Sequence, residues 1–190
     1  MLTSVHFSPS HHNTISPQHH LTTTPSHHNT ISPANLNTST PHHNTITIMT
    51  INEAQDEVIE QFQDFTDWMD KYQLLIDLGG DLEPLDDKYK NEQNLIDGCQ
   101  SRVWVQCDMT DDGRLVFTAD SDALIVKGII ALLIQVISGH TPREILDADL
   151  YFIERIGLKD HLSPTRSNGL LAMVKQIRMY ALAYETKANA

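Results

Sequence analysis

The side chains in this sequence best suited to covalent chemistry are its two cysteines, and their surroundings differ. Cys99 follows Gly98 and precedes the polar pair Gln100-Ser101, whereas a structural cysteine usually lies inside an apolar run. Such a turn can present free backbone N–H groups that stabilise the thiolate, the reactive form of cysteine. The glycine allows a sharp bend and close approach of a partner. We therefore expect Cys99 to be the reactive thiol, with an unreactive turn residue as the alternative.

The second cysteine has a different context. Cys107 alternates with Val103 and Val105, which predicts a place on the inner face of a strand. Two cysteines are too few for a disulfide framework, and a reducing compartment would keep them as thiols. The chain has no Cys-x-x-Cys pair, and neither His140 nor His161 lies near a cysteine in the sequence. Spacing alone therefore specifies neither a catalytic base nor a metal site.

The elements that position Cys99 begin with a helical pattern. Apolar residues recur at alternating spacings of four and three, which predicts one helix. Thr50 or Asn52 can cap its start, and Gly79-Gly80 is expected to end it. The apolar stripe consists of Val58, Phe62, Phe65, Met69, Tyr72 and Ile76.

A β region follows a polar loop. Residues 101–109 alternate, residues 111–113 form an Asp-Asp-Gly turn signal, and residues 114–119 supply a second strand, which together predict a hairpin. Residues 94–97 are expected to supply a short third strand. Gly98 and Cys99 would then lie on the connection between two strands.

Helical patterns fill the remainder of the chain. Asp120 or Ser121 is expected to cap the first of these helices, and a Thr-Pro-Arg-Glu capping box starts the next. The whole pattern predicts an α+β fold, a small antiparallel sheet of about three strands with helices packed on one side. Four helices are expected: one over residues 121–137, one that begins at residue 141, one over residues 149–156, and a last one that ends near residue 186.

The first 48 residues differ in composition from the rest. They carry nine of the eleven histidines, and related His-His-Asn-Thr-Ile segments recur at 11–17, 27–33 and 42–48. The apolar content is too low to offset the entropy of ordering, so we expect residues 1–48 to be a disordered tail and residues 49–190 to form the domain. Adjacent histidines can capture zinc weakly, but no cysteine or carboxylate completes a site. We favour the interpretation that Met49 is the true start.

Charge is confined to the predicted domain. All 13 basic and all 25 acidic residues lie from Glu53 onward, which produces the net charge of −12. Such a domain repels phosphate, so non-specific nucleic-acid binding is not expected. The longest apolar stretch, residues 124–137, is interrupted and too short to span a bilayer. The N-terminus lacks the basic region and apolar core of a secretory signal, so a soluble, cytoplasmic protein is expected.

Three segments resemble a known family in order and spacing. Residues 94–104 read Asn-Leu-Ile-Asp-Gly-Cys-Gln-Ser-Arg-Val-Trp and resemble the cysteine-loop signature of the SufE family of cysteine desulfuration proteins. Residues 120–128 resemble the helix start that follows its hairpin, and residues 161–169 resemble its late Pro-x-Arg-x-x-Gly segment. The resemblance covers residues 53–187 and implies a SufE/IscU-like α+β fold.

The resemblance implies a function in iron–sulfur cluster assembly. SufE-type proteins accept persulfide sulfur from a PLP-dependent cysteine desulfurase, of the SufS or CsdA type, and stimulate it. They pass sulfur to a downstream scaffold complex of the SufBCD type. The chain would then be a carrier, not an enzyme, with no cofactor of its own, because PLP belongs to the partner. A monomer or weak homodimer is implied, with no nucleic-acid or membrane partner.

The same resemblance assigns expected roles to individual residues. Cys99 matches the sulfur-accepting cysteine, which the family holds on a mobile loop with an apolar pocket for retreat. Asp122 matches an acidic residue that influences loop mobility, with helix capping as the alternative. Arg166 matches a late arginine that could stabilise the persulfide anion or contact the desulfurase, with a surface salt bridge as the alternative. The loop and partner-contact candidates are Gly98, Gln100, Ser101, Asp122 and Arg166.

Two other functions remain open from the residues. An iron–sulfur scaffold of the IscU type needs several converging cysteines, and this chain offers one exposed candidate. A lone-thiol enzyme, such as a hydrolase or peroxidase, needs a base or resolving thiol that the spacing does not identify.

Overall fold

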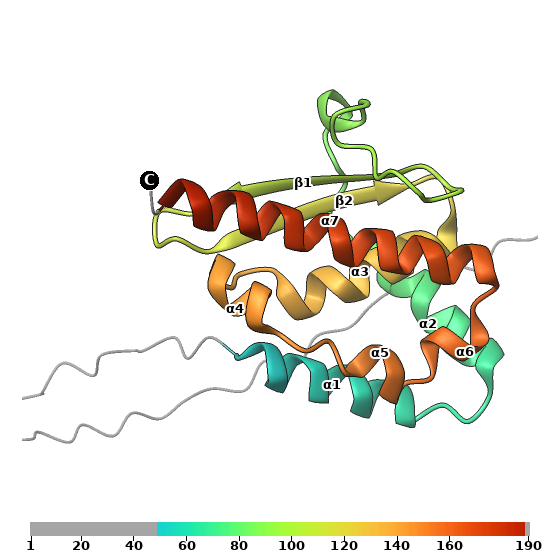
Figure 1. Cartoon of the computed structure of the whole chain (residues 1–190). Coiled ribbons are helices and arrows are strands. Elements are labelled where there is room, and N and C mark those ends of the chain that lie inside the picture. The colour runs from blue at the N-terminus through green and yellow to red at the C-terminus, as the bar shows by residue number, and fades with distance from the viewer. Residues whose placement is uncertain (1–48, 189–190) are drawn as a thin grey trace, which may run out of the picture. The chain divides into compact units, whose positions relative to one another are not determined.

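The structure is a computed structural model that describes residues 49–188. The expected disordered tail and the interpretation of Met49 as the true start concern residues outside the described ones. The elements (Figure 1) are α1 (Ile51–Gln63), α2 (Trp68–Asp81), the 3-10 helix η1 (Asp87–Tyr89), β1 (Val103–Met109), β2 (Leu115–Ser121), α3 (Leu124–Ile137), α4 (Pro142–Asp147), α5 (Phe152–Arg155), α6 (Leu158–His161) and α7 (Pro164–Ala188).

A two-stranded antiparallel sheet pairs β1 with β2, with Val105 opposite Ala119. The helices lie mainly on one side of this hairpin, which confirms the α+β class (Figure 1). The third strand expected over residues 94–97 is wrong: only an isolated bridge joins Leu95 to Trp104. The chain turns away at Gly98, whose φ of +88° is incompatible with continued pairing.

The outer edge of β1 is closed by side chains of α7. The Tyr180 hydroxyl donates to the carbonyl of Val105 at 2.9 Å, and the Tyr184 hydroxyl donates to the carbonyl of Cys107 at 3.1 Å. These bonds satisfy strand carbonyls that would otherwise be open to pairing with another chain. They also attach α7 to the strand that follows the Cys99 loop.

The core is built around α3, which packs on β2 and against α1, α2 and α7. Nine of its 14 residues are buried, as expected for an apolar helix of this length. The predicted cap is wrong, because Ala123 holds the N-cap position and makes no side-chain cap bond. Asp120 instead lies in β2 and pairs with Lys90 at 3.0 Å and Lys127 at 2.9 Å.

The single helix predicted at the start of the domain is also wrong, because the chain breaks between α1 and α2. Asp67 accepts a hydrogen bond from the Met69 N–H at 2.9 Å and caps the new helix. The break rotates the second half of the apolar stripe, so Met69 is 70% exposed. The predicted cap at Thr50 is confirmed, and it forms a capping box with Glu53.

Gly79 lies inside α2 instead of ending it. A Cβ atom at Gly79 would approach the backbone N of Gly128 to 2.8 Å, and one at Gly128 would approach the Leu75 carbonyl oxygen to 2.0 Å. These glycines therefore permit the close packing of α2 on α3.

The later helices follow the sequence signals in part. Thr141 and Glu144 form the predicted capping box, with Pro142 at the start of α4. The helix expected over residues 149–156 is limited to the single turn of α5, and α6 follows Gly157, which adopts a φ of +71°. Within residues 49–188, no helix is long and apolar enough to cross a membrane.

Candidate functional site

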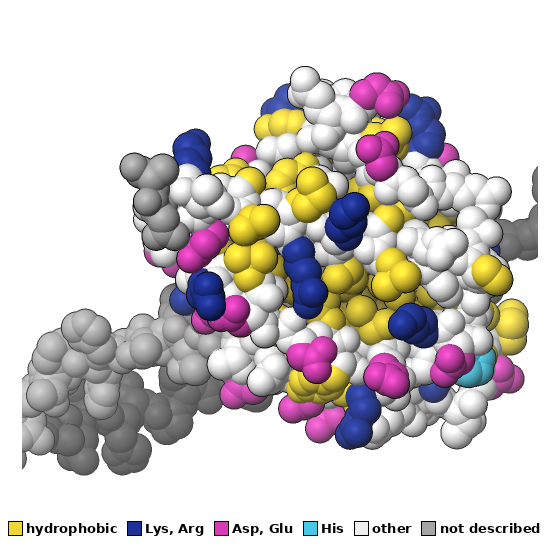
Figure 2. All heavy atoms as spheres, viewed as in Figure 1, with side chains coloured by type: hydrophobic (Ala, Val, Ile, Leu, Met, Phe, Trp, Pro, Cys, Tyr) yellow, Lys and Arg dark blue, Asp and Glu magenta, His cyan; other side chains and the backbone are white. Residues whose placement is uncertain are grey.

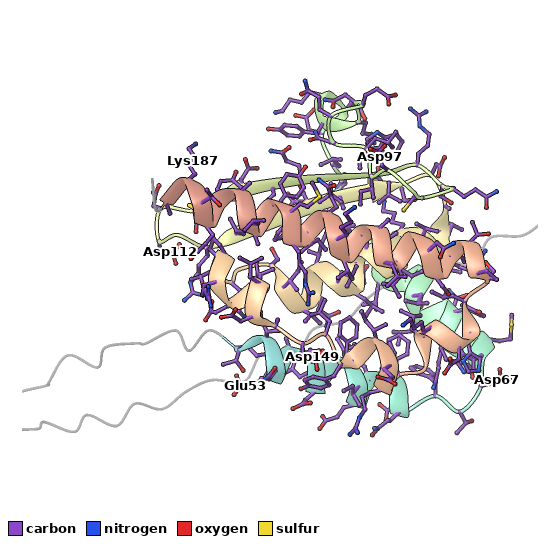
Figure 3. All side chains as sticks on the ribbon, viewed as in Figure 1. Glu53, Asp67, Asp97, Asp112, Asp149 and Lys187 are labelled. Atoms are coloured by element: carbon purple, nitrogen blue, oxygen red, sulfur yellow. The ribbon has the colours of Figure 1, made fainter. Side chains whose placement is uncertain are left out.

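Cys99 lies on the loop between the Leu95 bridge and the start of β1. Gly98 turns the chain immediately before it in a left-handed conformation that other residues rarely adopt. The side chain of Cys99 is half-buried, packed against the edge of the core. Figure 3 shows this loop, marked by Asp97, above the ribbon of α7.

The thiol of Cys99 contacts the second turn of α7. Its Sγ donates a weak hydrogen bond to the carbonyl oxygen of Gly169 at 3.5 Å. A Cβ atom at Gly169 would lie 3.4 Å from this sulfur, so a larger side chain would press on it. The glycine in α7 thus makes room for the sulfur atom.

The sequence suggested that backbone N–H groups would stabilise a Cys99 thiolate, and this expectation is wrong for the described conformation. The sulfur faces a carbonyl oxygen, which accepts hydrogen bonds and disfavours a nearby negative charge. Burial raises the pKa of the Cys99 thiol. The described surroundings therefore favour the protonated thiol over the thiolate, and reaction requires the sulfur to move or a partner to change its surroundings.

A pocket of about 380 Å³ opens beside Cys99. It brings together three predicted site residues, Gln100, Ser101 and Arg166, from two segments more than 60 residues apart. The apolar pocket that the resemblance implied is in fact mixed, with hydroxyl groups and a guanidinium in its lining. Its walls are Cys99, Gln100, Ser101, Val126, Ser163, Thr165, Arg166, Gly169 and Met173.

Asp122 is not in the pocket wall but holds the far end of the loop. Its Oδ1 accepts a hydrogen bond from the Arg102 backbone N–H at 3.0 Å, and its own N–H donates to the Arg102 carbonyl at 3.3 Å. The capping alternative is not supported, because α3 has no side-chain cap bond. Asp122 therefore anchors the three-residue segment between Cys99 and β1.

Arg166 lies in the first turn of α7 with an exposed side chain. Within residues 49–188 its guanidinium makes no ion pair or hydrogen bond, so the salt-bridge alternative is not supported. An unpaired guanidinium in the wall of the Cys99 pocket is available to an anion that forms there.

The other candidate reactive groups lie elsewhere. Cys107 is 3% exposed, and burial, together with Asp108, raises its pKa to about 12. His161 stacks on Trp68, with ring centroids 3.8 Å apart. His140 is buried, and its two ring nitrogens lie near the backbone carbonyls of Ile137 and Met49. No histidine of the described residues lines the Cys99 pocket.

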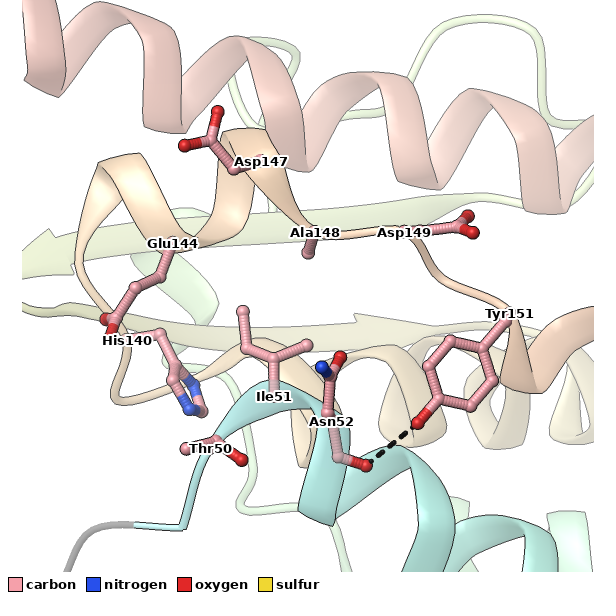
Figure 4. Close-up of a pocket in the computed structure, with 9 residues that line it drawn as sticks. All are labelled: Thr50, Ile51, Asn52, His140, Glu144, Asp147, Ala148, Asp149 and Tyr151. Atoms are coloured by element: carbon pink, nitrogen blue, oxygen red, sulfur yellow. Dashed lines mark hydrogen bonds between the residues drawn. The ribbon is translucent and has the colours of Figure 1, made fainter.

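A second hollow of about 450 Å³ lies between α1 and α4 (Figure 4). Several of its polar groups already have hydrogen-bond partners within the protein. Glu144 accepts from the Thr141 N–H at 2.8 Å, and the Tyr151 hydroxyl donates to the Asn52 carbonyl at 3.1 Å. Because this hollow contains no nucleophilic thiol, the Cys99 pocket is the stronger candidate for a reactive site.

Sequence reasoning missed several pocket residues. Gly169 carried a detectable signal, because glycine inside a long helix costs about 1 kcal/mol and requires a packing reason. Val126, Ser163 and Thr165 lie in the two later segments that resemble the family, but hydroxyl and apolar side chains at helix starts are common, so no site role was assigned to them. The missed residues are Val126, Ser163, Thr165, Gly169 and Met173.

Comparison with known proteins agrees with this geometry. The sequence model of the SufE family, described as an Fe-S metabolism associated domain, matches residues 56–181. This chain belongs to the SufE family. Its role therefore lies in iron–sulfur metabolism, and the resemblance read from the three segments is confirmed.

The fold also matches a solved structure. The solution structure of a hypothetical protein from Thermus thermophilus superposes with a TM-score of 0.59 at 21% sequence identity. The match covers 70% of this chain and 96% of that protein. This SufE-family chain thus shares the α+β architecture of that protein.

Proposed function

We propose that Cys99 accepts sulfane sulfur from a PLP-dependent cysteine desulfurase and carries it toward iron–sulfur cluster assembly. The observation that supports this proposal most is the placement of Cys99 on a glycine-preceded loop, in the wall of a pocket that also contains Arg166. Membership of a family associated with Fe-S metabolism also supports a role in iron–sulfur cluster assembly.

The transfer step is an exchange between a thiolate and a persulfide. The Cys99 thiolate attacks the outer sulfur of the donor persulfide, Cys–S–SH. A new S–S bond forms on Cys99, the S–S bond of the donor breaks, and the donor cysteine leaves as a thiolate. The proton lost from Cys99 is available to that leaving thiolate, so no external oxidant or reductant is needed.

The residues of the chain prepare and protect this exchange. Cys99 must first leave the Gly169 carbonyl, since a buried protonated thiol is a poor nucleophile. A persulfide is more acidic than a thiol, and the Arg166 guanidinium can offset its negative charge. Return of the loaded side chain to the pocket would limit its reduction or oxidation.

Under this proposal the chain is a carrier without its own cofactor. The desulfurase, of the SufS or CsdA type, holds PLP and breaks the C–S bond of cysteine. A SufBCD-type complex is the proposed receiver. The scaffold and lone-thiol alternatives are weaker, because the second cysteine, Cys107, points into the core and no described histidine lies in the pocket.

Intact-mass measurement without reductant tests the proposal. After incubation with a cysteine desulfurase and cysteine, the chain is expected to gain the mass of one or more sulfur atoms. Cys99→Ser is expected to gain none, and the matched variant Cys107→Ser is expected to gain as much as the unaltered chain. Full stimulation of desulfurase turnover by Cys99→Ser would contradict the proposal.

A further inference from the structure

The outward face of α7 carries an apolar stripe that the Cys99 chemistry does not use. Leu171, Met179 and Leu182 are 54%, 53% and 56% exposed. Their spacing of eight and three residues places them on one side of the helix, with Lys175 between them. Exposed large apolar side chains grouped on one face of a helix typically mark a contact surface.

The same helix differs in charge from the rest of the chain. It contains four of the 13 basic residues, Arg166, Lys175, Arg178 and Lys187, but one acidic residue, Glu185. The net charge of α7 is therefore 4 − 1 = +3, and that of the remaining chain is 9 − 24 = −15. Figure 2 shows Lys and Arg among apolar side chains across this face, with most Asp and Glu near its margins.

The basic groups of this stripe are available to a partner. The ammonium group of Lys175 makes no ion pair or hydrogen bond within the described residues. The Arg178 guanidinium donates to the carbonyl of Ala148 at 2.9 Å, a neutral partner that leaves its charge uncompensated. A matching surface would therefore present carboxylates around an apolar centre.

A second copy of the chain does not fit this description. An antiparallel pairing of two α7 helices that matches Leu171 with Leu182 would also place Lys175 opposite Arg178. Like charges would then face each other at the centre of the contact, which is unfavourable. Nucleic acid fits no better, because a chain with a net charge of −12 repels phosphate.

The stripe is continuous along α7 with the turn that lines the Cys99 pocket. Gly169 and Met173 border the pocket, and Leu171 lies between them in sequence on the outer side of the helix. From Leu171 to Leu182 the helix rises about 16 Å. A protein contact of standard size covers about 800 Å² on each partner, enough to include both the pocket rim and this stripe.

We propose that the α7 stripe (Leu171, Lys175, Arg178, Met179 and Leu182) is a docking surface for the sulfur-donating desulfurase, which presents an acidic-rimmed apolar patch to it. This inference rests on the proposed function, since it assigns the donor of the same site. Docking along α7 would bring the donor cysteine of the desulfurase to the Cys99 pocket. Binding of the desulfurase to the α7 stripe does not require the Cys99 thiol.

Binding and stimulation experiments with the SufS-type desulfurase of the same genome test the surface. Leu182→Glu and Lys175→Glu are each expected to raise the dissociation constant, and the concentration for half-maximal stimulation, by about tenfold. The maximal stimulated rate is expected to stay unchanged, because Cys99 and its pocket are intact. Circular dichroism is the check that both variants are folded.

Two control variants test whether the loss of binding is specific to the α7 stripe. Met69→Glu introduces the same charge at a 70% exposed site on α2, and Arg155→Glu reverses a charge on α5, so both are expected to bind within twofold of the unaltered chain. Unchanged binding of both α7 variants would overturn the docking surface. Cosedimentation of the unaltered chain, but not Leu182→Glu, with vesicles of anionic lipid would overturn it in favour of a membrane contact.

The two proposals can fail separately. If the unaltered chain gains sulfur on Cys99 and the α7 variants bind and gain it equally well, the docking surface is wrong and the sulfur-acceptor function stands. If the desulfurase binds through α7 but Cys99 gains no sulfur, the acceptor function is wrong. Absence of any binding by the unaltered chain overturns both.

Discussion

The two cysteines lie eight residues apart and occupy opposite kinds of environment. Cys99 is half-buried on a loop beside a pocket, and its sulfur contacts one carbonyl of α7. Cys107 is 3% exposed on the inner face of β1, where its own backbone carbonyl is held by Tyr184. Burial raises the pKa of both thiols. The comparison teaches that access to a pocket separates the candidate reactive cysteine from the structural one, since burial raises the pKa of both thiols.

The largest expected difference is in alkylation rate. At pH 8 under native conditions, iodoacetamide is expected to modify Cys99 at least about a hundredfold faster than Cys107, because Cys107 reacts only after the sheet opens. Mass spectrometry of digested, time-quenched samples measures both rates. As a control, the two alkylation rates are expected to become equal in denaturant. Comparable alkylation rates of Cys99 and Cys107 in the folded protein would contradict the distinction between the two sites.

The second prediction concerns stability at high pH. The folded chain keeps the Cys107 proton to a pKa of about 12, whereas an ordinary thiol loses it near 9. Between these values the unfolded chain binds fewer protons, so the contribution of Cys107 to the free energy of unfolding falls as pH rises. The slope is at most about 1.4 kcal/mol per pH unit.

Denaturant unfolding of the unaltered chain and of Cys107→Ala between pH 8 and 11 measures this contribution. The stability of the unaltered chain is expected to fall more steeply, since the variant lacks the buried thiol. Parallel curves for the two proteins would show that Cys107 does not hold its proton in the folded state. Cys99→Ala serves as the matched control and is expected to show a smaller change of slope.

A smaller effect is expected from release of the loop. Asp122→Ala removes the acceptor for the Arg102 N–H and should increase Cys99 alkylation by about fivefold, the effect of losing a hydrogen bond worth about 1 kcal/mol. Cys107 alkylation should stay unchanged. Asp97→Ala alters an exposed acidic residue of the same loop and is the control. An unchanged Cys99 rate would show that Asp122 does not restrain the loop.

The smallest effect is expected at the closed edge of β1. Tyr184→Phe removes the hydrogen bond to the Cys107 carbonyl and is expected to lower the free energy of unfolding by about 1 kcal/mol. The alkylation rate of Cys99 is expected to stay within twofold. A large rise in that rate would mean that the two cysteine environments are coupled through α7.

The expectations that failed have local causes in some places and distant contacts in others. The break between α1 and α2 follows local capping by Asp67, yet the apolar spacing alone favoured one continuous helix. Gly79 was expected to end α2, but it packs against Gly128, 49 residues further along the chain. The spacing of apolar residues cannot predict this contact between two helices, because it describes one helix or strand at a time.

The sequence by itself determined the β1–β2 hairpin, most of the helical segments, the contrast between a turn cysteine and a strand cysteine, and the SufE family. These follow from local composition, spacing and short segments in order. Only the tertiary structure decided that Cys99 rests against Gly169, 70 residues away, and that Asp122 anchors the loop through Arg102. The physical reason is that hydrogen bonds between distant segments depend on how helices pack on the sheet, which local propensity does not specify.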